Sequence, residues 1–119
     1  VSYAKKRSQF GAKIGTFQLV REMIAEAVAR VYAAKSLCLR AGETRRAGKP
    51  DSIIESTIAK HFAAGAAFRT ACDAVQIHGG NGFSNEYPVE RYMREAKVLE
   101  IIEGTAQIQQ MVISMHGLR

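Results

Sequence analysis

Small and apolar residues recur at helical spacing across residues 52–78, and strand signals are nearly absent from the whole chain. The flanking positions of this segment are mostly alanine, and side chains this small let neighbouring helix axes approach closely. The segment therefore predicts a central helix with other helices against several of its sides, in an all-α fold. Steps of four and three residues separate the members of its expected inward stripe, Ile54, Ile58, His61, Gly65, Phe68, Cys72 and Val75.

The N-terminal half predicts one more long helix. Residues 1–8 resemble the last turns of a helix, and residues 11–15 form a loop between two glycines. Thr16 is the expected N-cap of a helix that ends near residues 48–50. The apolar stripe of this helix comprises Val20, Ile24, Ala27, Val31, Ala34 and Cys38.

The C-terminal half predicts three helices. Either Asp51 or Ser52 caps the central helix, and the glycine cluster at residues 79–82 ends it. A short helix over residues 88–94 begins at a proline, and a last helix covers residues 104–116. Short connections between these elements favour an up-and-down bundle of about four helices.

The cysteine and histidine residues predict neither disulfide bonds nor a metal site. Cys38 and Cys72 are far apart and lie in apolar helical registers, which predicts small buried free thiols of a reducing compartment. His61, His78 and His116 lack the spacing of a metal site, so no metal is expected. We expect His61 to be a hydrogen-bonded histidine of the core or of an interface.

The chain carries 17 Lys and Arg against 11 Asp and Glu, a formal charge of +6 that favours anionic partners. The charge is spread out, with small clusters at residues 5–7 and 45–46 near expected helix ends, so solvated helix termini explain it about as well as a ligand site. No apolar run approaches the roughly 20 residues of a membrane span. The chain starts at Val1 without Met, and we expect a fragment of a longer protein.

One carboxylate, Glu103, follows the apolar pair Ile101 and Ile102 and precedes Gly104, where the last helix is expected to begin. The glycine leaves one side of the carboxylate open, and free N–H groups at a helix start bind anions or a developing oxyanion. The spacing permits a general base that also donates to an oxyanion. An acidic residue that complements the helix dipole is the commoner explanation, by about two to one.

The segment from Gln76 to Gly82 offers backbone amides that side chains leave uncovered, a surface on which a pyrophosphate can lie. No strand precedes it, so the sequence context of a dinucleotide fold or of a P-loop is absent. A helix C-cap followed by a turn is the default interpretation, with His78 as a capping or solvent-facing residue.

Several motifs occur in order along nearly the whole chain. They are Arg7-x-Gln9-Phe10-Gly11, Phe17-Gln18, Gln76-x-x-Gly79-Gly80-Asn81-Gly82-Phe83, Glu86-Tyr87-Pro88-Val89-Glu90-Arg91, Arg94-x-Ala96-Lys97 and Glu103-Gly104-Thr105-x-Gln107-Ile108-Gln109. Their order and intervals closely resemble the C-terminal helical domain of acyl-CoA dehydrogenases. A set of independent motifs in register is more specific than any one short pattern.

The resemblance implies an FAD-dependent enzyme of fatty acid β-oxidation that converts an acyl-CoA thioester to the trans-2,3-enoyl-CoA. Glu103 matches the family's general base, which removes the proton next to the thioester carbonyl while a hydride passes to flavin N5. The backbone N–H of Glu103 matches a donor to the carbonyl oxygen, and Gly104 matches a substrate contact. A carboxylate is a weak base in water, so such a site has to exclude water and acidify the substrate.

The same matching implies a set of cofactor contacts. Positions that resemble FAD-binding residues are Arg7, Gln9, Phe10, Gln18, Gln76, Ile77, His78, Gly79, Gly80, Thr105, Ala106 and Gln107. Arg7 would attract the pyrophosphate, and the bare amides of Gly79 and Gly80 would cradle it. Many of these positions serve across a subunit interface in the family, which implies a homodimer or homotetramer.

The resemblance also sets expectations beyond residues 1–119. An N-terminal helical domain and a middle β domain are absent from the chain, and the fragment alone is expected to be inactive. The implied electron acceptor is electron-transfer flavoprotein or a similar protein, in the cytoplasm of a bacterium or in the mitochondrial matrix of a eukaryote. Ile102 stands where many relatives carry Tyr or Phe, so the preferred acyl chain stays open.

Two alternatives remain at this point. An acyl-CoA oxidase would pass its electrons to oxygen and form hydrogen peroxide. A basic helical module that binds nucleic acid or merely assembles would account for the charge and the alanine stripe, and would show steeply salt-dependent binding without flavin colour. The motifs favour acyl-CoA as the ligand, with neither nucleic acid nor a membrane span.

Overall fold

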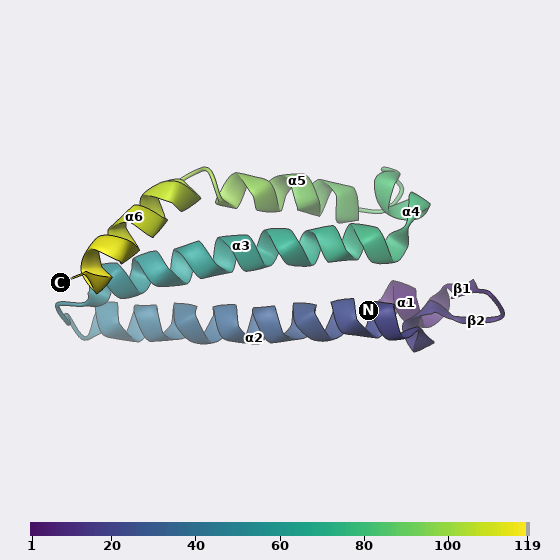
Figure 1. The fold of residues 1–119 in the computed structure, drawn as a ribbon, viewed down its shortest axis with the longest axis horizontal. Helices are drawn as coiled ribbons and strands as arrows, with labels where there is room; N and C mark the ends of the chain where they lie inside the picture. The colour runs from purple at the N-terminus through teal and green to yellow at the C-terminus, as the bar shows by residue number, and fades with distance from the viewer. Residues whose placement is uncertain (119) are drawn as a thin grey trace.

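The structure is a computed structural model that describes residues 1–118, and it confirms an all-α fold (Figure 1). Two very short strands form its only sheet within these residues. The elements in chain order are α1 (Ser2–Lys6), β1 (Ser8–Gln9), β2 (Ala12–Lys13), the 3-10 helix η1 (Ile14–Thr16), α2 (Gln18–Arg46), α3 (Ser52–His78), α4 (Gly80–Phe83), α5 (Val89–Leu99) and α6 (Ala106–Gly117).

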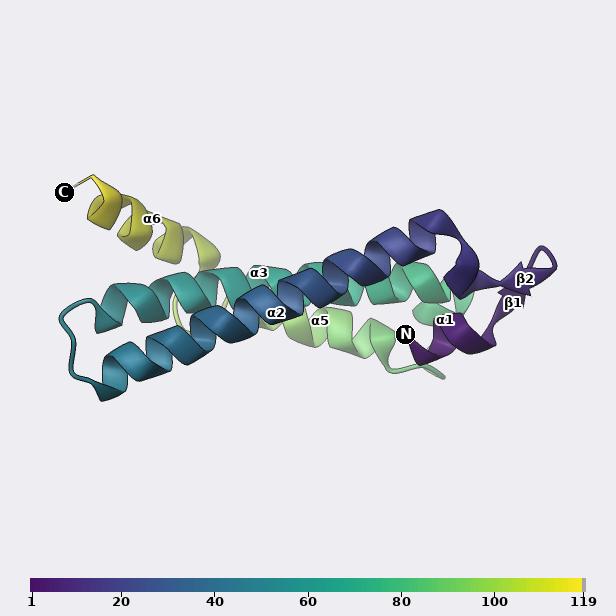
Figure 2. The ribbon, with the colours of Figure 1, turned by 90° about the horizontal axis from the view of Figure 1, so that it is seen from below.

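The long helices α2 and α3 lie side by side, and α5 and α6 lie along the other side of α3 (Figure 1). At a right angle to this view, α6 diverges from the axis of α3 (Figure 2). The molecule is elongated, with extents of 56 × 25 × 23 Å. The predicted central helix is therefore confirmed. The expectation of about four helices fits the four longer ones, α1 matches the helix tail expected at residues 1–8, and α4 was not expected.

Alanines make the core of α3. Ala59, Ala64, Ala66 and Ala71 are buried, whereas the expected inward stripe of larger residues is only half-buried. Because α3 packs against α2 on one side and α5 and α6 on the other, the closest contacts fall where side chains are smallest. The expected close approach of other helices at the alanines is therefore confirmed, whereas the expected inward stripe is less buried than predicted.

Several expected helix starts and ends are displaced. The Thr16 hydroxyl donates to Lys13 O at 2.6 Å within η1, so it does not cap α2, which follows Phe17 without a side-chain cap. The Asp51 side chain likewise makes no cap bond to α3. The last helix begins at Ala106, two residues later than expected.

Residues 8–13 form a small hairpin, although residue 8 was expected to end a helix and residues 11–15 to form a loop. Ser8 pairs with Lys13 and Gln9 with Ala12 in antiparallel register. Two-residue strands are too short for an alternating pattern to appear in the sequence. Helix α5 continues to Leu99, five residues beyond the expected end, because no glycine or proline interrupts it.

The two cysteines differ in burial. Cys38 on α2 is exposed, so the expectation of a buried Cys38 was wrong, while Cys72 is half-buried. His61 is half-buried as an interior residue, yet its Nδ1 finds no hydrogen-bond partner in the described chain. No helix among these residues is long and apolar enough to cross a membrane.

Ion pairs join α2 to α3. Arg40 binds the Glu55 carboxylate through Nε and Nη2, at 2.6 Å for the shortest contact, and these hydrogen bonds raise the pKa of Arg40 above its ordinary value. Arg30 Nη1 donates to Asp73 Oδ2 at 2.6 Å, with both side chains about three quarters buried or more.

We expect Arg30→Met to lower the free energy of unfolding by roughly 1–2 kcal/mol, because it leaves the half-buried Asp73 carboxylate without its charged partner. Chemical denaturation of the complete protein measures this loss. Arg94→Met is the matched control, since Arg94 is 69% exposed and pairs with Glu90 within one helix. Equal losses in both variants would contradict the prediction.

Candidate functional site

The glycine cluster at residues 79–82 ends α3 as expected. Gly79 has φ 59° and ψ −137°, a backbone conformation that favours glycine, and its N–H donates to Val75 O and Gln76 O at 3.1 Å each. A Cβ built on Gly79 or Gly80 would meet no atom within 4 Å, so both glycines present open backbone. A Cβ on Gly82 would lie 2.4 Å from Val75 O, so this position requires glycine.

An aromatic cluster holds α1 against this turn. Tyr3 stacks on His78 with ring centroids 4.0 Å apart, and Tyr87 meets Tyr3 edge-on at 5.5 Å. Asn81 Nδ2 donates to the Tyr3 hydroxyl at 2.9 Å, and His78 Nδ1 lies 2.7 Å from Ala74 O. His78 is therefore a packed residue that supports the turn. The solvent-facing alternative was therefore wrong, because the Tyr3 ring from the distant N-terminus covers His78, whereas the contact with Ala74 O in the last turn of α3 fits the capping alternative.

A cavity of about 320 Å³ lies over this turn. Of the residues expected to bind FAD, it brings together Arg7, Gln9 and the segment from Gln76 to Gly80, with Ile77 and His78 in its lining. Tyr3, Ile14 and Asn81 complete the lining. Asn81 belongs to the segment from Gln76 to Gly82 that the sequence indicated, whereas Tyr3 and Ile14 were not expected at a site. Tyr3 lies two residues before the basic cluster at residues 5–7. A single aromatic residue in such a place is too common to mark a site residue.

The backbone of Arg7 is fixed on both sides while its side chain stays exposed. Its N–H donates to Tyr3 O at 2.9 Å, and its carbonyl accepts from Ile14 N at 3.0 Å. Phe10 lies at the tip of the hairpin, 94% exposed with φ 51°, and Gln18 is exposed at the start of α2. These two expected cofactor residues share this end of the molecule without lining the cavity.

The donors at this end suit an anion better than a metal. Arg7 supplies a guanidinium, Gln9 and Gln76 supply carboxamides, and Gly80 supplies bare backbone. Such a set fits a diphosphate group. The expectation of a free amide at Gly79 was wrong, because its N–H already donates to Val75 O and Gln76 O at the end of α3. Within residues 1–118, no three His, Cys, Asp or Glu side chains come close enough to hold a metal ion.

Glu103 lies in a tight turn between α5 and α6. Glu103 has φ 55° and Gly104 has φ 88°, both in the left-handed region that non-glycine residues rarely adopt. Ala106 N donates to Glu100 O at 2.9 Å and closes the turn, and Thr105 Oγ1 accepts from Ile108 N at 3.3 Å as the cap of α6. The Glu103 side chain is exposed, so residues 1–118 leave it open to solvent.

Two side chains from outside the turn donate hydrogen bonds to its backbone carbonyl oxygens. Lys60 Nζ on α3 donates to Gly104 O at 2.7 Å. Gln109 Nε2 on α6 lies 3.3 Å from both Glu103 O and Gly104 O. Sequence reasoning assigned neither residue to a site, and a contact between positions 60 and 104 has no periodic signal that could predict it.

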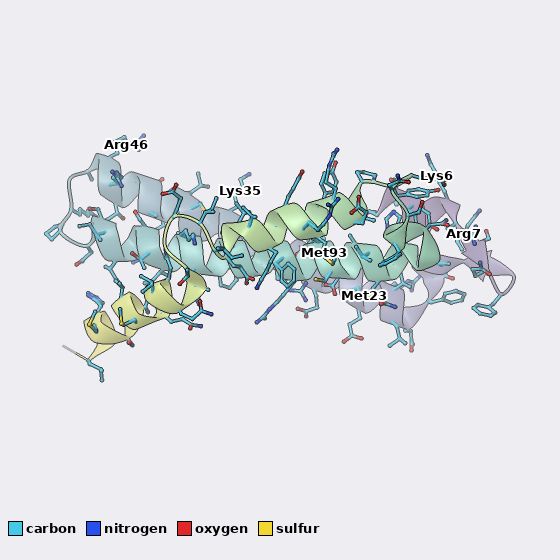
Figure 3. All side chains as sticks on the ribbon, turned by 90° about the horizontal axis from the view of Figure 1, so that it is seen from above. Lys6, Arg7, Met23, Lys35, Arg46 and Met93 are labelled. Atoms are coloured by element: carbon cyan, nitrogen blue, oxygen red, sulfur yellow. The ribbon has the colours of Figure 1, made fainter. Side chains whose placement is uncertain are left out.

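The two groups of expected site residues lie apart along the long axis of the molecule. Figure 3 shows Arg7 near one end, whereas Thr105, Ala106 and Gln107 lie at the start of α6, which Figure 1 shows beside α3 toward the other end. Lys60, which holds the Glu103 turn, and Gln76, which lines the cavity, are 16 residues apart on α3 (76 minus 60). This separation is roughly 24 Å along the helix axis. The structure thus assembles two half-sites, and residues 1–118 do not join them.

Known proteins match this chain over its whole length. Residues 1–118 match the family model described as acyl-CoA dehydrogenase, C-terminal domain. The chain is 43% identical over 119 residues to a probable acyl-CoA dehydrogenase, FadE25, of Mycobacterium tuberculosis. The match covers all of this chain and 31% of that protein. It is 43% identical over 114 residues to subunit CarC of the caffeyl-CoA reductase-Etf complex of Acetobacterium woodii, 96% of this chain and 30% of that protein.

The structure of butyryl-CoA dehydrogenase from Megasphaera elsdenii superposes with a TM-score of 0.94 at 41% identity, over 99% of this chain and 30% of that one. The chain therefore spans about 31% of the length of the curated relatives that it matches. The family model, the sequence identity and the fold agree. The chain belongs to the acyl-CoA dehydrogenase family, of which it forms the C-terminal helical domain.

Proposed function

We propose that the protein containing this chain is an FAD-dependent acyl-CoA dehydrogenase that oxidises an acyl-CoA thioester to the trans-2,3-enoyl-CoA. The observation that carries the proposal is the Glu103 turn. The backbone of Glu103, next to Gly104, adopts a left-handed conformation, and the side chains of Lys60 and Gln109 donate hydrogen bonds to the carbonyls of the turn. Strained backbone that the surrounding structure maintains is typical of functional sites.

Glu103 acts as the general base. Its carboxylate accepts the proton on the carbon next to the thioester carbonyl, and its backbone N–H donates to the carbonyl oxygen, which stabilises the charge that develops there. Bound FAD supplies the acceptor for the hydride from the neighbouring carbon. Gly104 lets the thioester approach the backbone, because a glycine has no side chain between them. The remaining walls that exclude water from this carboxylate come from polypeptide outside residues 1–119.

Each FAD molecule is held by one half-site of each kind. Arg7, Gln9 and the open backbone at Gly80 fit its pyrophosphate, and Gly79 lets it approach because no side chain covers the turn there. Thr105 and Gln107 add a hydroxyl and an amide beside the Glu103 turn, with Ala106 at the start of α6. Phe10 and Gln18 extend the first half-site beyond the cavity.

The two half-sites belong to two different cofactor molecules, each shared between two copies of the chain. Their separation along α3 supports this arrangement. Large exposed apolar side chains also support contacts with further polypeptide, because soluble proteins rarely leave so many uncovered. They include Phe10, Leu19, Tyr32, Ile53, Phe83 and Leu118. A homodimer or homotetramer satisfies the arrangement.

We expect Arg7→Glu in the complete protein to weaken FAD binding by about 10- to 100-fold, because it replaces the cation of the phosphate site with an anion. FAD titration measures the loss, and Lys35→Glu on the exposed face of α2 is the matched charge reversal.

Co-expression of Arg7→Glu and Glu103→Gln chains should restore turnover, since mixed oligomers contain one intact shared site. Failure of mixed oligomers to regain any activity would contradict the sharing.

The electron acceptor is an electron-transfer flavoprotein or a similar protein. The name of the Acetobacterium woodii relative, a subunit of a reductase-Etf complex, supports this choice. An oxidase would instead form hydrogen peroxide in air during turnover, which a peroxidase-coupled assay detects. The expected location is the cytoplasm in a bacterium and the mitochondrial matrix in a eukaryote.

The test of the proposed function is anaerobic mixing of the complete protein with a panel of acyl-CoAs of different length and branching. We expect at least one to bleach the flavin absorbance and to yield the enoyl-CoA. A protein that binds no FAD, or whose flavin no acyl-CoA bleaches, would refute the proposal. The best substrate of the panel would also show how Ile102 shapes the acyl pocket.

A further inference from the structure

The Glu103 turn needs support from outside itself. Left-handed backbone is unfavourable for a residue with a Cβ, because the Cβ crowds the following carbonyl oxygen. Glu103 adopts it directly before Gly104, which is left-handed as well. A non-glycine residue stays in such a conformation only where neighbouring groups maintain it.

Gln109 provides the first support. It is buried, with 8% of its surface exposed, and is the one buried polar side chain of the described chain. Its Nε2 reaches the carbonyls of both Glu103 and Gly104 at 3.3 Å, while its Oε1 accepts no hydrogen bond from residues 1–118. The NH₂ group is therefore the part of this amide that the fold uses.

Lys60 provides the second support, from a different element. Its ammonium donates to Gly104 O at 2.7 Å, a short charge-assisted hydrogen bond that ties the turn to α3. The carbonyl and N–H of a trans peptide point in opposite directions. Bonds that draw the carbonyls of Glu103 and Gly104 toward α3 and α6 therefore direct the N–H groups of Gly104 and Thr105 the other way.

We propose that Lys60 and Gln109 are positioning residues that fix the Glu103 turn, and through it the direction in which the Glu103 carboxylate points. The inference rests on the proposed function, in which this carboxylate meets the substrate. Neither side chain touches the substrate. Each acts by holding a backbone carbonyl, so loss of either one lets the turn relax and the carboxylate move away from its working position.

The test uses the complete protein with bound FAD and compares Lys60→Met with wild type. Misplacing a reacting group by about 1 Å costs up to about 10²-fold in rate. We expect flavin reduction at saturating acyl-CoA to slow by about 10- to 100-fold, with substrate affinity little changed. The isotope effect from substrate deuterated next to the carbonyl should increase as proton abstraction becomes limiting. Gln109→Met should act in the same direction.

Two controls separate positioning from general stability. Lys60→Arg keeps a cationic donor and should recover most of the rate, and Lys35→Met removes an exposed lysine of α2 and should behave as wild type. Hydrogen exchange supplies a readout that needs no turnover. The Ala106 amide, whose bond to Glu100 O closes the turn, should exchange severalfold faster in Lys60→Met than in Lys35→Met.

The outcomes distinguish this inference from the function on which it rests. Unchanged flavin reduction and unchanged Ala106 exchange in Lys60→Met, beside an active wild type, would overturn the positioning role alone. A wild-type protein whose flavin no acyl-CoA reduces would overturn the proposed function and the positioning role together. Slower reduction with faster exchange, rescued by Lys60→Arg, supports both.

Discussion

Glu103→Gln in the complete protein should retain FAD and lose about 10²- to 10⁴-fold in turnover, the usual effect of removing a general base. The amide keeps the size of the side chain but accepts protons far more weakly than the carboxylate. The backbone N–H that donates to the substrate carbonyl stays, so the substrate should still bind. The loss should therefore fall on kcat more than on KM.

The matched control is Glu95→Gln, which removes an exposed carboxylate of α5, 64% exposed and 3.5 Å from Arg91. It should leave turnover near that of wild type. Stopped-flow flavin reduction measures both variants, and flavin absorbance shows that the cofactor is retained. A near-normal rate in Glu103→Gln with every acyl-CoA would remove Glu103 from the mechanism.

Gly82→Ala should be the most destabilising single methyl addition in the chain. The new Cβ would lie 2.4 Å from Val75 O, 2.9 Å from His78 Cβ and 3.0 Å from Val75 Cα. Two of these three atoms are backbone of α3, so relief requires movement of the helix end. We expect a loss of about 3 kcal/mol, at the upper end of the cost of overpacking, together with weaker FAD binding as the adjoining turn shifts.

Gly80→Ala lies in the same short helix and is the control, because its Cβ would meet no atom within 4 Å. Thermal and chemical denaturation of the complete protein, with and without added FAD, compare the two variants. Similar losses of stability in both would show that the close contact at Gly82 is not what limits substitution.

The sequence predicts the central helix and its end well, because both depend on local signals. Alanine spacing identifies α3, and the left-handed Gly79 that ends it follows from the glycine cluster. The predicted N-cap at Thr16 was wrong because this residue belongs to η1. Backbone hydrogen bonds from Ile14 N to Arg7 O and from Phe17 N to Ile14 O stabilise η1. Such bonds leave no trace in a one-dimensional pattern.

Long-range contacts of the site could not be predicted in the same way. His78 packs on Tyr3 from the other end of the chain, and Lys60 reaches Gly104 across 44 positions. Only the three-dimensional arrangement shows that α3 carries one half-site at its end and supports the other near its start. The exposure of Cys38 likewise depends on what covers α2, which no stripe of apolar residues specifies.

A structure of the complete protein with FAD and a non-oxidisable acyl-CoA analogue would show directly which group faces the reacting carbon. We predict that the Glu103 carboxylate lies roughly 3–3.5 Å from the carbon next to the thioester carbonyl, in a site closed to water. A Glu103 side chain in bulk solvent, with a different group facing that carbon, would show that Glu103 is not the general base.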